Sequence, residues 1–311
     1  MTVHTRSGDS HAETSLVGMS DEDFRALSQL VHDRTGIVLS EGKRWMLASR
    51  LAKEINRLGL PDLAAYRKLL ARPDAEPELE ALTSAITTNV TSFFRGPDHF
   101  EALAALVPSL REQSKRGQRV RLWSAACSTG QEPCSIAMTL LEHWPEAAQA
   151  DVRILATDID AQVVEEARQG VYDERLLEGP AEKTIRRFSA AGPRPGTIRV
   201  VPAVRGLIRY EQLNLLGPWP FGGSFDVIFC RNVVIYFDNE TRARLWHRLA
   251  DRITPGGWLY IGHSERVDRA LDPYLTPGGV TRYRRTATPI RDNLTAPQIS
   301  GKGGPYQAKE R

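Results

Sequence analysis

The sequence has few cysteines, little net charge and no long hydrophobic run. Its three cysteines, Cys127, Cys134 and Cys230, form no Cys-x-x-Cys pair and join no histidine cluster, so we predict neither a disulfide framework nor a metal site. The 41 basic and 38 acidic residues leave a charge of +3, which argues against binding nucleic acid by bulk electrostatics. No stretch approaches the roughly 18 apolar residues of a membrane span, and residues 1–15 lack a signal-peptide core. We therefore expect a cytoplasmic protein, by default a monomer, that is neither exported nor inserted into a membrane.

The sequence also lacks the two common glycine-rich phosphate motifs, GxGxxG and GxxxxGK[ST]. In their place, residues 120–126 are typical of an apolar strand, residues 128–130 form a Ser-Thr-Gly turn, and Glu132 and Pro133 suit a first helical turn. Turns of this kind at the carboxyl end of a parallel strand bind nucleotides in α/β sheets. Because both motifs are missing, we expect a ligand smaller and less anionic than a dinucleotide or a nucleoside triphosphate.

A second strand and an acidic residue extend this pattern. Residues 152–157 are apolar and lead to Asp158, and residues 160–169 have the periodicity of a helix. An acid at this place meets ribose hydroxyls in Rossmann-like units. The alternative is that Asp158 only caps the next helix.

Residues 19–90 are predicted to form a small helical domain after a disordered tail at residues 1–18. Ser20 and the acids that follow it mark a helix start. Apolar periodicity indicates helices over residues 20–35, 42–58, 62–70 and 78–87.

The second of these helices is strongly basic. Its only acid is Glu54, and its basic residues, several of which share one face, are Lys43, Arg44, Arg50, Lys53 and Arg57. Such a face either docks an anionic partner or is simply solvated.

The segment TTNVTSFFR at residues 87–95 is unusual for a linker. It combines hydroxyls, an amide, two aromatic rings and an arginine, which suit a polar ligand with a flat base. The alternative is a helix end followed by a hydrophobic staple. A further helix is expected over residues 100–110.

The rest of the chain alternates strands and helices. We expect strands over residues 206–213, 225–230, 258–262 and 279–284, a helix over residues 239–253, and an inserted antiparallel β-subdomain at about residues 174–205. This alternation implies an α/β fold with a mainly parallel sheet. Residues 286–311 are expected to form a flexible tail.

Five stretches make the chain resemble the CheR family of chemotaxis receptor methyltransferases, which use S-adenosylmethionine (SAM). They are TTNVTSFFR (87–95), WSAACSTGQEP (123–133), ILATDID (154–160), FDVIFCRNVVIYF (225–237) and GGWLYIGHSE (256–265). The likeness covers residues 20–285. It implies a Rossmann-like, seven-stranded SAM-dependent methyltransferase sheet within residues 91–285, an N-terminal all-helical domain and a small inserted antiparallel β-subdomain.

The resemblance also implies a cofactor site. By motif, contacts to SAM are expected from Asn89, Thr91, Arg95, Glu132, Asp158, Asn214, Leu215, Asn232 and Val233. Glu132 would hold the amino acid end of SAM, and Asp158 would accept from the ribose. Taken as residues alone, Glu132 also fits a helix start, and Asn214 and Asn232 also fit strand-end turns.

We also expect catalytic roles for three residues, one of which, Arg95, is also an expected cofactor contact. Arg95 would orient a carboxylate of the substrate or the cofactor, Tyr236 would line the methyl channel, and Arg111 is a further basic candidate.

The implied reaction transfers a methyl group from SAM to a receptor glutamate, giving a γ-methyl ester and S-adenosylhomocysteine. A carboxylate is ionised at neutral pH and needs no general base, so positioning and desolvation would suffice. The implied partner is the acidic helical bundle of the cytoplasmic receptor region, which would dock on the basic helix.

Three alternatives are open: a catalytically silent SAM-binding signalling protein, a methyltransferase acting on a small molecule or nucleic acid, and an NAD-dependent oxidoreductase. The missing (N/D)PP(Y/F) and GxGxxG motifs disfavour the last two.

Overall fold

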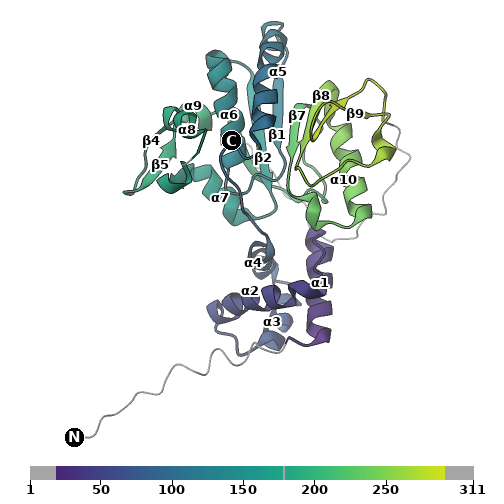
Figure 1. Cartoon of the computed structure of the whole chain (residues 1–311). Helices are drawn as coiled ribbons and strands as arrows, with labels where there is room; N and C mark the ends of the chain where they lie inside the picture. The colour runs from purple at the N-terminus through teal and green to yellow at the C-terminus, as the bar shows by residue number, and fades with distance from the viewer. Residues whose placement is uncertain (1–18, 178, 291–311) are drawn as a thin grey trace, which may run out of the picture.

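The computed structural model describes residues 19–177 and 179–290. A helical domain lies beneath an α/β domain, and the α/β domain carries a small β-subdomain (Figure 1). The predicted tail at residues 1–18 and most of the predicted tail at residues 286–311 lie outside the described residues. Within the described ranges, no helix has the length and apolar character needed to cross a lipid bilayer.

Four helices form the N-terminal domain: α1 (Asp21–Thr35), α2 (Arg44–Arg57), α3 (Leu63–Leu70) and α4 (Glu76–Ile86). Helix α1 begins where Ser20 Oγ accepts from the Asp23 amide, and it ends at Gly36, whose φ of 74° favours glycine. Helix α4 begins two residues before the predicted start, because Pro77 fits a first helical turn. A 3₁₀ turn, η1 (Glu41–Lys43), leads into α2. The apolar faces enclose one core, which includes Phe24, Leu27, Leu47, Leu51 and Leu82.

A seven-stranded sheet forms the second domain, in the order β6-β2-β1-β7-β8-β10-β9. Its strands are β1 (Val120–Ser124), β2 (Val152–Asp158), β6 (Ile208–Gln212), β7 (Phe225–Cys230), β8 (Ile253–Ile261), β9 (Leu275–Pro277) and β10 (Arg282–Arg285). All neighbours pair in parallel except β10, which is antiparallel to both β8 and β9. The predicted fold class is confirmed. Strand β9 was not predicted, because three residues that include a proline give little strand signal.

Helices cover both faces of the sheet. They are α5 (Pro97–Lys115), α6 (Gln131–His143), α7 (Ala161–Gln169) and α10 (Asn239–Asp251). Side chains alternate along β1, so Leu122 packs into the core shared with α5 and α6, whereas Trp123 packs into the core shared with α10. Helix α5 extends beyond the predicted range of residues 100–110 at both ends: it begins at Pro97, and the polar residues 111–115 continue it.

The inserted β-subdomain is a three-stranded antiparallel sheet, as predicted. Its strands are β3 (Val171–Asp173), β4 (Ser189–Ala191) and β5 (Thr197–Val200), and its helices are α8 (Glu182–Arg187) and α9 (Pro202–Arg205). It starts slightly before the predicted residue 174, because β3 pairs with β5. Buried Ile198 and Val200 join the core beneath α6 and fix the subdomain on the sheet domain.

Asp160 ties the helical domain to the sheet domain. Its buried carboxylate caps α7 by accepting from the Gln162 amide at 3.0 Å. It also accepts from Ser84 Oγ at 2.6 Å, Thr87 Oγ1 at 3.0 Å and Asn89 Nδ2 at 2.9 Å. Because these three residues end α4 and begin the linker, one side chain sets how the two domains meet.

We predict that Asp160→Ala destabilises the protein by about 2–4 kcal/mol, because it removes a helix cap and leaves several donors without their acceptor. The matched control is Asp62→Ala, which removes only the α3 cap to the Ala65 amide and is expected to cost about 1 kcal/mol. Urea unfolding measures both values. Equal losses in the two variants would contradict the tethering role.

Candidate active site

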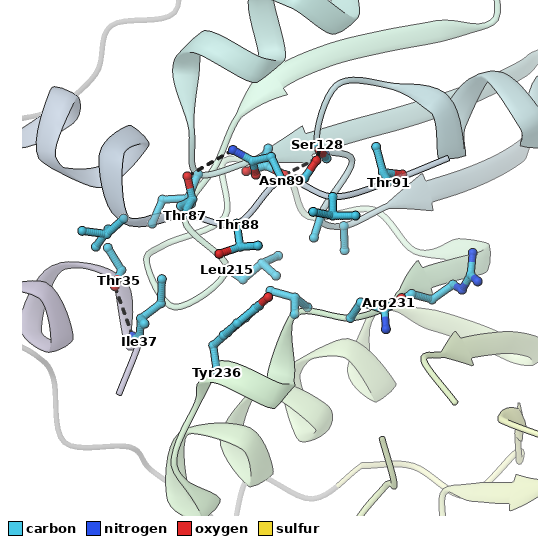
Figure 2. Close-up of a pocket in the computed structure, with 18 of the residues that line it drawn as sticks. Thr35, Ile37, Thr87, Thr88, Asn89, Thr91, Ser128, Leu215, Arg231 and Tyr236 are labelled. Carbon is cyan, nitrogen blue, oxygen red and sulfur yellow. Dashed lines mark hydrogen bonds between the residues drawn. The ribbon is translucent and has the colours of Figure 1, made fainter. Parts of the chain in front are cut away.

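A pocket lies at the carboxyl ends of β1, β2, β6 and β7, between the sheet and the helical domain (Figure 2). The strand order reverses between β1 and β7, and open α/β sheets bind ligands at such a point. One wall consists of residues that follow the strands, including Ala125, Ser128, Asp158, Leu213 and Asn232. The other wall consists of the linker and the helical domain, including Asn89, Ile37, Leu39, Lys43 and Met46.

Glu132 and Arg231 form a buried ion pair in this pocket. Glu132 lies in the first turn of α6, where its Oε1 accepts from Ser124 Oγ at 2.7 Å and its Oε2 accepts from Arg231 Nη1 at 3.0 Å. The other terminal nitrogen of Arg231 donates to the Arg95 carbonyl. The pair therefore joins β1, the start of α6, the end of β7 and the linker. Arg231 was not predicted as a site residue; the available signal was an arginine directly after a strand that is apolar except for Asp226.

Asp158 lies at the end of β2 and points into the same pocket. Its Oδ2 accepts from the Ser128 amide at 2.8 Å, and its Oδ1 accepts from the Asp160 amide at 3.1 Å. Burial raises the pKa of the Asp158 carboxyl to about 6, although these backbone donors oppose the shift. A carboxylate oxygen can accept more than one hydrogen bond, so Asp158, which lines the pocket, can still accept from a ligand donor.

The linker residues Asn89, Thr91 and Arg95 line the same pocket, and Figure 2 shows Asn89 beside Ser128. The Asn89 amide nitrogen is held by Asp160, and the Asn89 carbonyl accepts from Ser128 Oγ at 2.9 Å. Arg95 is exposed, and its Nη1 donates to the Val90 carbonyl at 2.9 Å. The linker is thus fixed by its backbone, while the Arg95 charge is accessible.

The loops after β6 and β7 complete the pocket with Asn214, Leu215, Asn232 and Val233. The Asn214 amide nitrogen donates to the Arg34 carbonyl at 2.8 Å, and its oxygen accepts from the Leu216 amide, so it has the turn-forming contacts of the simpler alternative. Asn232 has a φ of 59°, in the left-handed region that asparagine tolerates.

Glu265 holds the turn after β7 and was also missed by sequence analysis. Its buried carboxylate accepts from the amides of Gly262 at 2.6 Å, Val233 at 3.0 Å and Val234 at 3.2 Å. Three backbone donors on one side chain fix the backbone beside Asn232. The available signal was a glutamate just beyond the β8 strand, in a turn with a glycine.

Tyr236 and Lys43 also line the pocket, and Lys43 Nζ lies 5.5 Å from the centre of the Tyr236 ring. Arg111 does not: it lies on α5 and pairs with Glu146 at 3.3 Å. All nine expected cofactor residues and Tyr236 therefore lie around one pocket, whereas Arg111 lies elsewhere. Within the described ranges, no group of three His, Cys, Asp or Glu residues is placed to hold a metal ion.

Both domains match models of one protein family. The model described as "CheR methyltransferase, all-alpha domain" matches residues 22–87, and the model described as "CheR methyltransferase, SAM binding domain" matches residues 89–279. The chain belongs to the CheR methyltransferase family. A probable chemotaxis protein methyltransferase of Rhizobium etli is 45% identical over 262 residues, which cover 83% of this chain and 97% of that relative. The chemotaxis protein methyltransferase of Escherichia coli is 38% identical over 273 residues, which cover 87% and 93%.

The pocket of this CheR methyltransferase fits SAM in its chemistry. Buried Asp158 offers acceptors for ribose hydroxyls, and buried Glu132 offers an anionic partner for an ammonium group. Ile159, Leu213 and Leu215 give apolar surface for a flat base. SAM carries a positively charged sulfur and no phosphate, which agrees with the missing glycine-rich phosphate motifs.

The raised pKa of Asp158 predicts that cofactor binding depends on pH. If ribose hydroxyls donate to the ionised Asp158 carboxylate, protonation below a pKa of about 6 should weaken binding by up to about tenfold per pH unit. Calorimetric titration with S-adenosylhomocysteine, a non-reactive analogue, between about pH 5 and pH 7.5 measures this. Asp158→Asn should bind more weakly at pH 7.5 and lose the dependence. A wild-type affinity that stays constant over this range would contradict the role of Asp158.

Proposed function

We propose that this chain transfers the methyl group of SAM to glutamate side chains of chemoreceptors, giving γ-methyl esters and S-adenosylhomocysteine. The names of the two relatives support the link to chemotaxis. One feature of the pocket supports a carboxylate as the methyl acceptor. Its described lining residues contain two carboxylates, Glu132 and Asp158, and no histidine. If both carboxylates hold the cofactor, none serves as a general base, and an acceptor that is already ionised suits the site better than an amine or alcohol.

The chain's residues would hold SAM at three points. Glu132 would accept from its amino group while keeping the bonds to Ser124 and Arg231. The exposed guanidinium of Arg95 would pair with its carboxylate. Asp158 would accept from the ribose hydroxyls. Contacts from Asn89, Thr91, Asn214, Leu215, Asn232 and Val233 belong to the same proposal.

The acceptor would then be positioned beside Tyr236. Bound SAM supplies a methyl group on a positively charged sulfur; a carboxylate oxygen forms the new bond to carbon as the carbon–sulfur bond breaks, and the electron pair stays on sulfur. No proton moves. Because positive and negative charge neutralise each other along this path, a site between two domains that excludes water and holds the oxygen in line favours the transition state.

We further propose that the basic side of α2 contacts the acidic helical bundle of the cytoplasmic receptor region. Lys53 and Arg57 are exposed. Arg44 forms ion pairs within the helical domain, and Arg50 donates to the carbonyls at the end of α4. Arg44 and Arg50 thus stabilise the domain in addition to any contribution to its positive surface. Salt should weaken such docking.

The direct test is transfer of radiolabelled methyl from SAM to a soluble chemoreceptor signalling fragment from the same organism. We expect label on the receptor that mild base releases, because esters hydrolyse where methylated amines do not. Replacing the acceptor glutamates by alanine in the fragment should abolish the label. Base-stable label would point to another acceptor chemistry. Normal SAM binding without any transfer would favour the catalytically silent alternative.

A further inference from the structure

The pocket contains three cations, Lys43, Arg95 and Arg231. Arg231 is buried, and both of its terminal nitrogens donate within the protein, to Glu132 and to the Arg95 carbonyl. Two cations therefore remain for ligands. In the proposed complex two ligand carboxylates must be held, one on SAM and one on the acceptor, so the number of free cations equals the number of carboxylates.

The two free cations come from different segments of the same wall of the pocket. Arg95 belongs to the linker, and its carbonyl accepts from Arg231, which binds Glu132. This places Arg95 at the amino acid end of the cofactor site. Lys43 comes from the helical domain and lies over the Tyr236 ring. Figure 2 shows Tyr236 across the pocket from Thr88 and Asn89.

Lys43 differs from its basic neighbours in how its charge is used. Arg44 pairs with Asp21 and Glu41, and Arg57 pairs with Glu54, whereas within residues 19–177 and 179–290 no ion pair involves Lys43. Lys43 is partly buried. Near it, the pocket is lined by the apolar residues Ile37, Leu39 and Met46, which suit the methylene groups of a glutamate side chain. Within the described residues this ammonium has no carboxylate partner, and with apolar surface beside it, it is suited to a ligand carboxylate.

We propose that Lys43 binds the carboxylate of the acceptor glutamate, so that the acceptor side chain binds tightly only when it carries a negative charge. This inference rests on the proposed function and refines it, because it separates Lys43 from the docking residues on the α2 surface. The acceptor loses its negative charge as the ester forms, so the interaction with Lys43 weakens along the reaction path. Lys43 therefore acts on acceptor selection and on release of the neutral ester more than on the rate of the chemical step.

The test measures binding of receptor fragments that carry a single candidate acceptor position, either as glutamate or as glutamine, to the full chain loaded with S-adenosylhomocysteine. We expect the wild-type protein to bind the glutamate fragment about tenfold more tightly, the effect of one charge-assisted hydrogen bond. In Lys43→Gln the ratio of the affinities for the glutamate and glutamine fragments should fall to nearly one. Lys43→Arg should restore most of the preference for glutamate. In turnover assays, Lys43→Gln should raise KM for the receptor far more than it lowers kcat.

Lys68→Gln is the matched control, because Lys68 is an exposed lysine on α3 of the same domain and outside the pocket. It should keep the wild-type preference. Cofactor affinity should be unchanged in all variants, which also shows that they are folded. If the wild-type protein forms base-labile ester and Lys43→Gln still prefers glutamate tenfold, the role of Lys43 is wrong while the proposed function stands. If the wild-type protein forms no such ester, both the proposed function and the role of Lys43 are wrong.

Discussion

The buried ion pair between Arg231 and Glu132 joins parts of the chain that are far apart in sequence. Two charges at 7% and 8% exposure would be costly to bury alone, and breaking such a pair costs about 3–5 kcal/mol. Each partner is held further, Glu132 by Ser124 and Arg231 by the Arg95 carbonyl. The positions of the linker, of the first turn of α6 and of the turn after β7 therefore depend on one another.

The proposed function requires the pocket to hold two ligands of different charge, SAM and an acceptor carboxylate. The sheet side presents carboxylates that are fixed by backbone and side-chain donors, as at Asp158. The linker and helical domain present cations whose charges are accessible, Arg95 and Lys43. Asp160 fixes the two sides relative to each other through its bonds to the end of α4 and the linker. A reaction in which opposite charges neutralise each other benefits from such a preorganised site.

Much of this fold could be predicted from the sequence, because apolar runs, turn residues and helical periodicity are local signals. Strand β7 was predicted at its observed bounds for this reason. Contacts between distant residues leave no such signal. Arg231 looked like an ordinary residue after a strand, and only its bond to Glu132, 99 positions earlier, gives it a role. Asp160 looked like a simple helix start, and its bonds to Ser84, Thr87 and Asn89 became visible only in the folded chain.

In the proposed function, the Arg231–Glu132 pair sets the geometry of the cofactor site. The most direct test of this claim is the affinity of the full-length Arg231→Lys variant for S-adenosylhomocysteine at neutral pH. Lysine keeps the charge but cannot hold the Glu132 carboxylate and the Arg95 carbonyl in one fixed fork. Arg285→Lys is the control, because Arg285 is a buried arginine that donates to the Ala250 carbonyl outside the pocket. The account predicts binding weaker by about tenfold to a hundredfold in Arg231→Lys and near wild-type binding in Arg285→Lys. A folded Arg231→Lys protein that binds as tightly as the wild type would contradict it.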